Sequence, residues 1–197
     1  MGLDAAANET SCRRRYSFKN AQTIALGSFY RGDYKAAAGI YDQALESAMH
    51  AGDAQLILIS KVNVAKVAVK QGRLQAAAAS LRKLSQDADS IGLKYVSVEC
   101  SMYLAEALLD MKNYEAARKG LEGAISRSEK LDARGLLAQN HYLLARALEL
   151  SGDDAEAQGH YKQARTIADE VQKEAHADTI LKRSDLSPIF ALTSNKP

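Results

Sequence analysis

The sequence predicts an all-α solenoid, and three observations support that prediction. A motif recurs with a period of 40 residues, no proline occurs before Pro188, and apolar residues recur at helical spacing. Proline removes a backbone donor and breaks helices, so a long stretch without it favours uninterrupted helices. An internal repeat of this length is typical of stacked helical hairpins, each of which buries its apolar face against the next.

The repeat aligns in four copies without an insertion. The copies start at residues 31, 71, 111 and 151 and read RGDYKAAAGIYDQAL, QGRLQAAAASLRKLS, MKNYEAARKGLEGAI and SGDDAEAQGHYKQAR. Gly32, Gly72 and Gly152 can each end a helix in the left-handed conformation, and Asp33 and Asn113 can cap the helix that follows. Each copy therefore centres on a tight turn between two helices.

Small residues recur on both sides of each turn and mark where helices cross closely. The upstream column is Ala25, Ala65, Ala105 and Ala145, and the downstream column is Ala37, Ala77, Ala117 and Ala157. Apolar residues around them repeat every three or four positions, which gives one apolar face per helix. We expect first helices over residues 18–31, 53–71, 93–111 and 134–151, and second helices over about 34–50, 74–90, 114–131 and 154–175.

This pattern resembles the tetratricopeptide repeat (TPR). An aliphatic–small pair in helix A, Gly-Asp-Tyr at the turn and A-x3-Y-x2-A in helix B carry the resemblance over residues 18–176. The period is 40 instead of the usual 34, and the usual proline after helix B is missing, as in long-helix variants of bacterial signalling and regulatory proteins. The resemblance implies a right-handed superhelix of about four hairpins that binds peptides or proteins.

The two ends of the chain lie outside the repeat. Residues 1–17 have no helical period and are expected to be a flexible lead. Residues 177–197 contain several apolar side chains, and Ser187-Pro188 is a typical helix start. We expect this tail to form a short helix that caps the solenoid, because a terminal repeat needs a cover. The alternative is that the tail packs against a partner or a second copy, which would allow a homodimer.

The resemblance also suggests where a partner binds, because helices A build the concave wall in this family. Transferred to this chain, that geometry gives a mixed set of aromatic, polar and charged candidates: Gln22, Phe29, Tyr30, Asn63, Lys66, Lys70, Glu99, Tyr103, Glu106, Asp110, Gln139, Tyr142 and Arg146. Tyrosines among mixed charges suit an extended peptide. The alternative is that several only pair with each other, such as Lys66 or Lys70 with Glu106 or Asp110.

Composition and motifs argue against several other classes. The net charge of +2 comes from residues 1–20, so the rest of the chain is neutral, which disfavours a nucleic-acid partner. No apolar run could span a membrane. No catalytic motif occurs, so neither an enzyme nor a cofactor is expected. His141 and His160 are expected at opposite phases of one hairpin, without a shared metal. Two widely separated cysteines fit a reducing compartment, and we expect a cytoplasmic protein.

These observations predict an interaction module or scaffold that binds a peptide or protein on its concave face. It could be part of a larger bacterial signalling protein. Two alternatives stay open: a peptide-sensing regulatory receptor of the TPR type, and a scaffold that self-assembles through its apolar tail.

Overall fold

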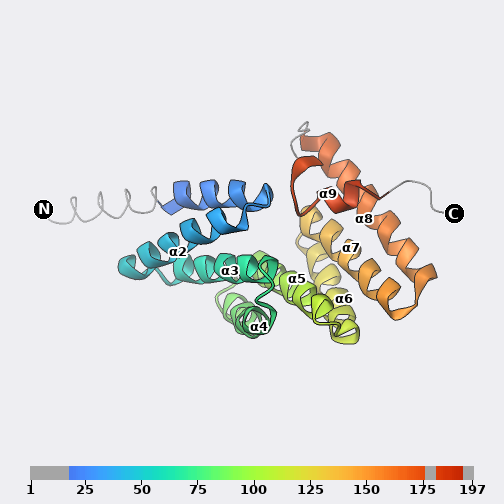
Figure 1. Cartoon of the computed structure of the whole chain (residues 1–197), viewed down its shortest axis with the longest axis horizontal. Helices are drawn as coiled ribbons and strands as arrows, with labels where there is room; N and C mark the ends of the chain where they lie inside the picture. Colours follow the sequence, from blue (N-terminus) through green and yellow to red (C-terminus); the bar gives the residue numbers. More distant parts are fainter. Residues whose placement is uncertain (1–17, 176–180, 193–197) are drawn as a thin grey trace, which may run out of the picture.

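A computed structural model describes residues 18–175 and 181–192 of the chain. Within these ranges helices follow one another as antiparallel hairpins, and no strand occurs (Figure 1). The first helix covers residues 18–30 and pairs with α2 (Tyr34–Ala51). The other hairpins are α3 (Ala54–Lys70) with α4 (Leu74–Ser90), α5 (Lys94–Asp110) with α6 (Tyr114–Lys130), and α7 (Arg134–Ser151) with α8 (Asp154–Ala175). The predicted all-α solenoid is confirmed.

Every turn has the same backbone geometry, and the turns are 20 residues apart. A left-handed residue stands at Gly32, Gly52, Gly72, Gly92, Lys112, Asp132 and Gly152. At Gly72 the backbone N–H donates to the carbonyl of Val69, and the next N–H, on Arg73, donates to Ala68. These bonds satisfy carbonyls that the helix end would leave free. The 40-residue repeat thus consists of two halves of equal length, each one helix and one turn.

Side-chain caps hold only some of the helix starts. Asp33 accepts from the N–H of Ala36 at 3.0 Å, and Asn113 accepts from Ala116 at 3.4 Å, as the sequence predicts. Asp53 caps α3 in the same way. Arg73, Leu93 and Ala133 occupy the equivalent position without a side-chain cap. Tertiary packing therefore has to stabilise α4, α5 and α7, because their starts lack the contribution of a cap.

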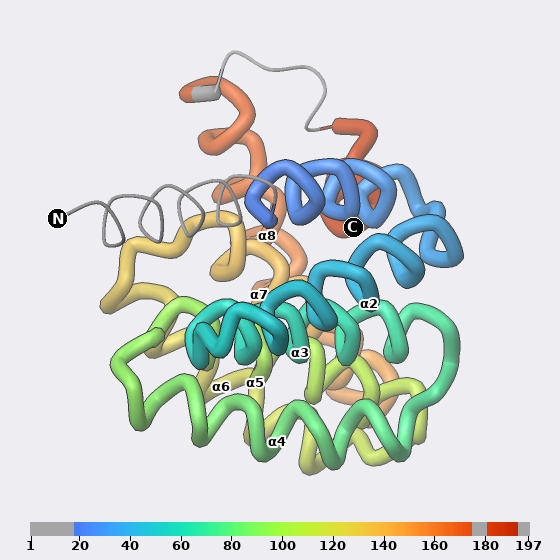
Figure 2. The backbone as a smooth tube through the Cα atoms, turned by 90° about the vertical axis from the view of Figure 1, so that its left-hand side faces the viewer, coloured from blue at the N-terminus to red at the C-terminus, as the bar shows by residue number. Residues whose placement is uncertain are grey.

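The hairpins form two layers (Figure 2). The first helices pack against one another, α3 on α5 and α5 on α7. Each of α4 and α6 contacts its own partner and the first helix of the next hairpin, α2 contacts α3, and α8 contacts α7 and α9. Below, the inner layer means residues 18–30, α3, α5 and α7, and the outer layer means α2, α4, α6 and α8. The predicted alanines are buried at the crossings: Ala25, Ala65, Ala105, Ala145, Ala37, Ala77, Ala117 and Ala157. Small side chains there allow the close approach.

The C-terminal segment folds back onto the last hairpin. Its helix α9 (Ser187–Phe190) begins one residue earlier than expected, with Leu186 at the N-cap position and Pro188 in the first turn. Leu186 and Ile189 are buried in a cluster with Ala138, Ala164 and Ala168. The face of α8 that a fifth repeat would cover is thus closed by this chain itself, as the capping prediction requires. The lead over residues 1–17 and the ends of the tail lie outside the described residues.

No helix in the described ranges has both the length and the apolarity to cross a bilayer.

Candidate functional site

Lys66 lies at the centre of the inner layer and is buried, with 2% of its surface exposed. Its Nζ donates to Glu99 Oε1 at 2.6 Å and to Asn63 Oδ1 at 3.4 Å. The ammonium also lies over the rings of Phe29 and Tyr103, 5.3 and 5.2 Å from their centroids. Burial alone would lower the pKa of Lys66, but the charge of Glu99 and its hydrogen bond outweigh burial and raise it. Lys66 is therefore charged and joins three successive hairpins.

Two further polar contacts extend this network along the inner layer. Lys70 forms an ion pair with Glu106 and lies 5.7 Å from the centroid of Tyr103. Asn63 donates to Gln22 Oε1 at 2.6 Å, which joins α3 to the first helix. The pairing alternative is thus confirmed for Lys70 and Glu106, whereas Lys66 pairs with Glu99. Four of the six charged candidates are thus paired with one another, although only Lys66 is fully buried.

The aromatic candidates divide into buried and accessible rings. Phe29 and Tyr103 are 0% and 3% exposed and meet edge to face with centroids 6.2 Å apart, so they pack in the core and cannot be reached directly. Tyr30 and Tyr142 are half-buried. Burial raises the pKa of Tyr30 to about 12, partly opposed by the charge of Arg183. Of the remaining candidates, Asp110 is exposed and Arg146 is half-buried.

The segment that precedes α9 lies on this inner layer. The backbone N–H of Ser184 donates to the carbonyl of Tyr30 at 2.8 Å, and the Ser184 hydroxyl donates to the carbonyl of Phe29 at 3.1 Å. The Arg183 guanidinium lies 3.7 Å from the centroid of the Tyr30 ring. Asp185 accepts from Arg183 at 2.7 Å and from the Gln139 amide at 3.1 Å. Residues 183–185 therefore connect the first helix to α7. We call them the strap.

The sequence interpretation missed three residues of this surface. Tyr95 is 54% exposed on α5, one helical turn before Glu99. Its spacing could have revealed it, because Tyr95, Glu99 and Tyr103 follow one another at intervals of four on one helix face. Arg183 and Asp185 carry no such signal, because they belong to a non-periodic segment whose path depends on tertiary contacts.

The prediction that His141 and His160 lie at opposite phases of their hairpin is wrong. His141 on α7 and His160 on α8 face each other, with their Nδ1 atoms 2.9 Å apart and their rings stacked. The two helices of an antiparallel hairpin run side by side, so residues at similar distances before and after the turn face each other. The position of a residue on its own helix does not show this contact. Burial and the charge of His160 lower the pKa of His141 to about 4. Within the described residues no group of three or more metal-ligand side chains occurs. Two histidines alone fall short of a zinc site.

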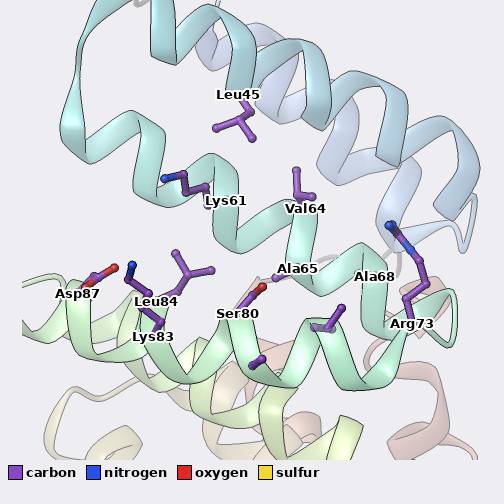
Figure 3. A pocket seen from close by; sticks show the side chains of 13 residues that line it. Leu45, Lys61, Val64, Ala65, Ala68, Arg73, Ser80, Lys83, Leu84 and Asp87 are labelled. Carbon is purple, nitrogen blue, oxygen red and sulfur yellow. The ribbon is translucent and has the colours of Figure 1, made fainter.

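A separate pocket of about 540 Å³ opens between α2, α3 and α4 (Figure 3). Several of its lining residues on α3 and α4 are alanines, whose small side chains leave the space unfilled. Leu45, Val64 and Leu84 supply apolar walls, and Lys61 and Lys83 lie at its edge. It lies away from the strap and the Lys66 network.

The repeat geometry agrees with a family comparison. Residues 97–170 match the sequence model of the tetratricopeptide repeat. The matched stretch lies in the third and fourth hairpins, and the first two hairpins repeat the same helix lengths and turns at the same period. Residues 97–170 therefore carry tetratricopeptide repeats, and the first two hairpins share their fold. This TPR fold is typically a non-catalytic interaction module, and the comparison indicates no enzyme family. No curated protein matches the chain at a significant level of sequence similarity.

Three solved TPR-like structures are similar to this chain. A Rap protein complexed with competence and sporulation factor is 19% identical with a TM-score of 0.72, over 88% of this chain and 48% of that one. PlcR from Bacillus thuringiensis, in complex with the peptide PapR7 and DNA, is 16% identical with a TM-score of 0.71, over 88% and 65%. Kinesin light chain TPR-like repeats from Podospora anserina are 16% identical with a TM-score of 0.60, over 88% and 85%.

The chain spans about half the length of the Rap chain and 65% of the length of the PlcR chain. At these identities the likeness shows the fold alone.

Proposed function

We propose that the inner layer of these tetratricopeptide repeats binds a peptide or an extended segment of a protein partner. One observation carries the proposal: this surface holds a turn of polypeptide, the strap, through backbone and side-chain hydrogen bonds. A surface that can hold three residues of its own chain in this way has the donors and acceptors that peptide recognition needs.

The inner layer is also rigid where a ligand would lie. Lys66 and Lys70 are each fixed by a carboxylate from the next hairpin, and buried rings pack beneath them. Because these side chains are already held in place, a ligand that binds beside them causes little further loss of side-chain entropy. The accessible rings of Tyr30, Tyr95 and Tyr142 can then add contact area, since tyrosine loses little freedom when it is covered.

The comparisons support the same class of partner. The PlcR structure is named as a complex with the peptide PapR7 and DNA, and the Rap structure as a complex with competence and sporulation factor; both share the fold of this chain. The cancelling charges outside residues 1–20 favour a peptide or protein over a nucleic acid. A role in a larger signalling protein of the cytoplasm agrees with the partial coverage of those chains and with Cys100, which is free and buried.

Site-directed photo-crosslinking tests the proposal. A photo-reactive amino acid at position 95, on the inner layer, is compared with one at position 82, where an exposed arginine lies on α4. With a random peptide library we expect crosslinked peptides from position 95 at several times the yield from position 82. Ligands selected in this way should bind Tyr95→Ala at least about thirtyfold more weakly, which is the size of an interface hot spot. Equal yields from both positions, or no ligand at all, would overturn the proposal.

A further inference from the structure

We propose that the strap is a built-in competitor for the inner layer, and that the partner presents the same chemistry: an arginine and an aspartate separated by one serine or threonine. This inference rests on the proposed peptide-binding function and specifies its ligand. It follows from what each strap residue contacts.

The arginine position is defined by an aromatic face. Arg183 lies 3.7 Å from the centroid of Tyr30, a distance at which a planar guanidinium stacks on the ring. Burial would lower the pKa of Arg183, but the hydrogen bond and charge of Asp185 outweigh it and raise the pKa. A lysine would keep the charge in this position but lose the planar stacking.

The aspartate position is defined by a buried amide. The side chain of Asp185 is 5% exposed, and Gln139, at 8%, donates to it. A carboxylate this buried needs both a cation and a donor, and Arg183 and Gln139 supply them. Because Lys66 and Lys70 are already neutralised by Glu99 and Glu106, the surface favours a ligand whose own charges cancel.

The middle residue binds through its backbone and hydroxyl. The carbonyls of Phe29 and Tyr30 lie at the end of the first helix. The Phe29 carbonyl also accepts from the Gly32 N–H at 2.9 Å, and a carbonyl oxygen has a second lone pair to offer. Ser184 donates its N–H to one and its hydroxyl to the other. Any residue except proline supplies the N–H, but only serine or threonine also supplies the hydroxyl at this short reach.

The cap has contacts of its own, besides the Leu186 and Ser187 N–H groups that donate to the Arg183 carbonyl. The cap is held by different contacts: Ile189 is buried against α7 and α8, and Arg165 donates to the carbonyls of Phe190 and Leu192 at 2.7 and 3.1 Å. None of these atoms belongs to residues 183–185. A tethered strap competes at an effective concentration on the order of millimolar, so a ligand binds more tightly once the strap is weakened.

The test uses the full chain and a fluorescent peptide with the sequence of residues 181–188, LKRSDLSP. Its control is LKDSRLSP, in which the two charges are exchanged. By fluorescence anisotropy we expect Arg183→Ala/Asp185→Ala to bind LKRSDLSP at least about tenfold more tightly than the unaltered chain. Lys182→Ala, which alters the exposed neighbour of the strap, should match the unaltered chain. Adding Gln139→Ala to the released variant should abolish the gain.

A second variant guards against loss of folding. Ser184→Pro removes the N–H that Tyr30 accepts, leaves both charges in place, and should show the same gain in affinity. Equal affinity of LKRSDLSP for the released and unaltered chains overturns the competitor role, and equal binding of LKDSRLSP overturns the recognition chemistry. If a released chain binds library peptides but not LKRSDLSP, this inference fails and the proposed function stands. If it binds no peptide, both fail.

Discussion

The inner and outer layers of the solenoid differ in what they bury. Of the nine polar or charged side chains buried among the described residues, eight lie in the inner layer: Ser28, Ser60, Asn63, Lys66, Ser97, Gln139, Asn140 and His141. The outer layer buries only Ser128. First helices are covered on several sides by neighbouring helices, so even polar positions on them become buried, whereas second helices keep an ordinary solvent face.

The difference extends to the ion pairs. Lys66 and Glu99 have side chains only 3% and 19% exposed. In the outer layer, Arg118 pairs with Glu122, whose side chains are 34% and 53% exposed. Loss of one partner of a buried pair strongly destabilises the fold, because the other charge stays in the interior without a counter-ion. An exposed pair contributes little to stability. Matched substitutions in the two layers can therefore test whether the contrast is energetic as well as geometric.

The largest effect is expected from Glu99→Ala. The substitution leaves the Lys66 ammonium buried without its carboxylate, and we expect a loss of about 3–5 kcal/mol in the free energy of unfolding. Urea denaturation at pH 7 measures it. Glu122→Ala is the matched control in the outer layer and should leave the midpoint unchanged. Similar losses in both variants would contradict the distinction between the layers.

An intermediate effect on stability is expected from lowering the pH, through His141 at its contact with His160 between the layers. The folded pKa of His141 is about 4 and its ordinary value is 6.5, so the unfolded chain binds this proton more readily. Stability from this group is therefore complete above pH 6.5 and falls as the pH drops toward 4, by about 2 kcal/mol at pH 5.

Thermal unfolding between pH 7 and pH 4 checks this prediction. His141→Gln should flatten the pH dependence, because the titrating group is gone. His50→Gln, at the exposed end of α2, should retain the profile of the unaltered chain. A profile that is unchanged in His141→Gln would show that other groups cause the acid sensitivity.

The smallest effect is expected from Tyr41→Phe in the outer layer. The Tyr41 hydroxyl is buried without a hydrogen-bond partner, so its removal should be neutral or stabilising by up to about 1 kcal/mol. Tyr161→Phe is the contrast, since the Tyr161 hydroxyl donates to Glu149 at 2.7 Å and its loss should be slightly destabilising. Chemical denaturation of both variants should give shifts of opposite sign, and a clear loss in Tyr41→Phe would reveal a hidden partner.

The helices, the turns and the alanine crossings could be predicted from the sequence because each depends on local spacing. Ala65 and Ala105 lie 40 residues apart and occupy equivalent helix crossings, so the position of one predicts the position of the other. The pairing of Lys66 with Glu99 could not be chosen over Glu106 by spacing, since it depends on the offset between neighbouring helices. The contact of His141 with His160 depends on how the two faces of one hairpin meet.

The strap was the least predictable part of the site. Arg183 and Asp185 follow no period, and their contacts with Tyr30 and Gln139 join residues far apart in the chain. The sequence predicted that an apolar tail returns to cover the last hairpin, because exposed apolar area requires a cover. Nothing local indicated that the residues just before the cap would reach the first helix.

That reach changes the mechanics of the molecule. Repeats in a solenoid normally contact only their neighbours, so such a molecule extends like an open spring. Here the Ser184 hydroxyl meets the carbonyl of Phe29 across 155 residues of sequence. Pulling the two ends of the superhelix apart must break this contact before the coil can lengthen. We therefore expect this contact to add to the resistance that the contacts between neighbouring repeats offer to stretching.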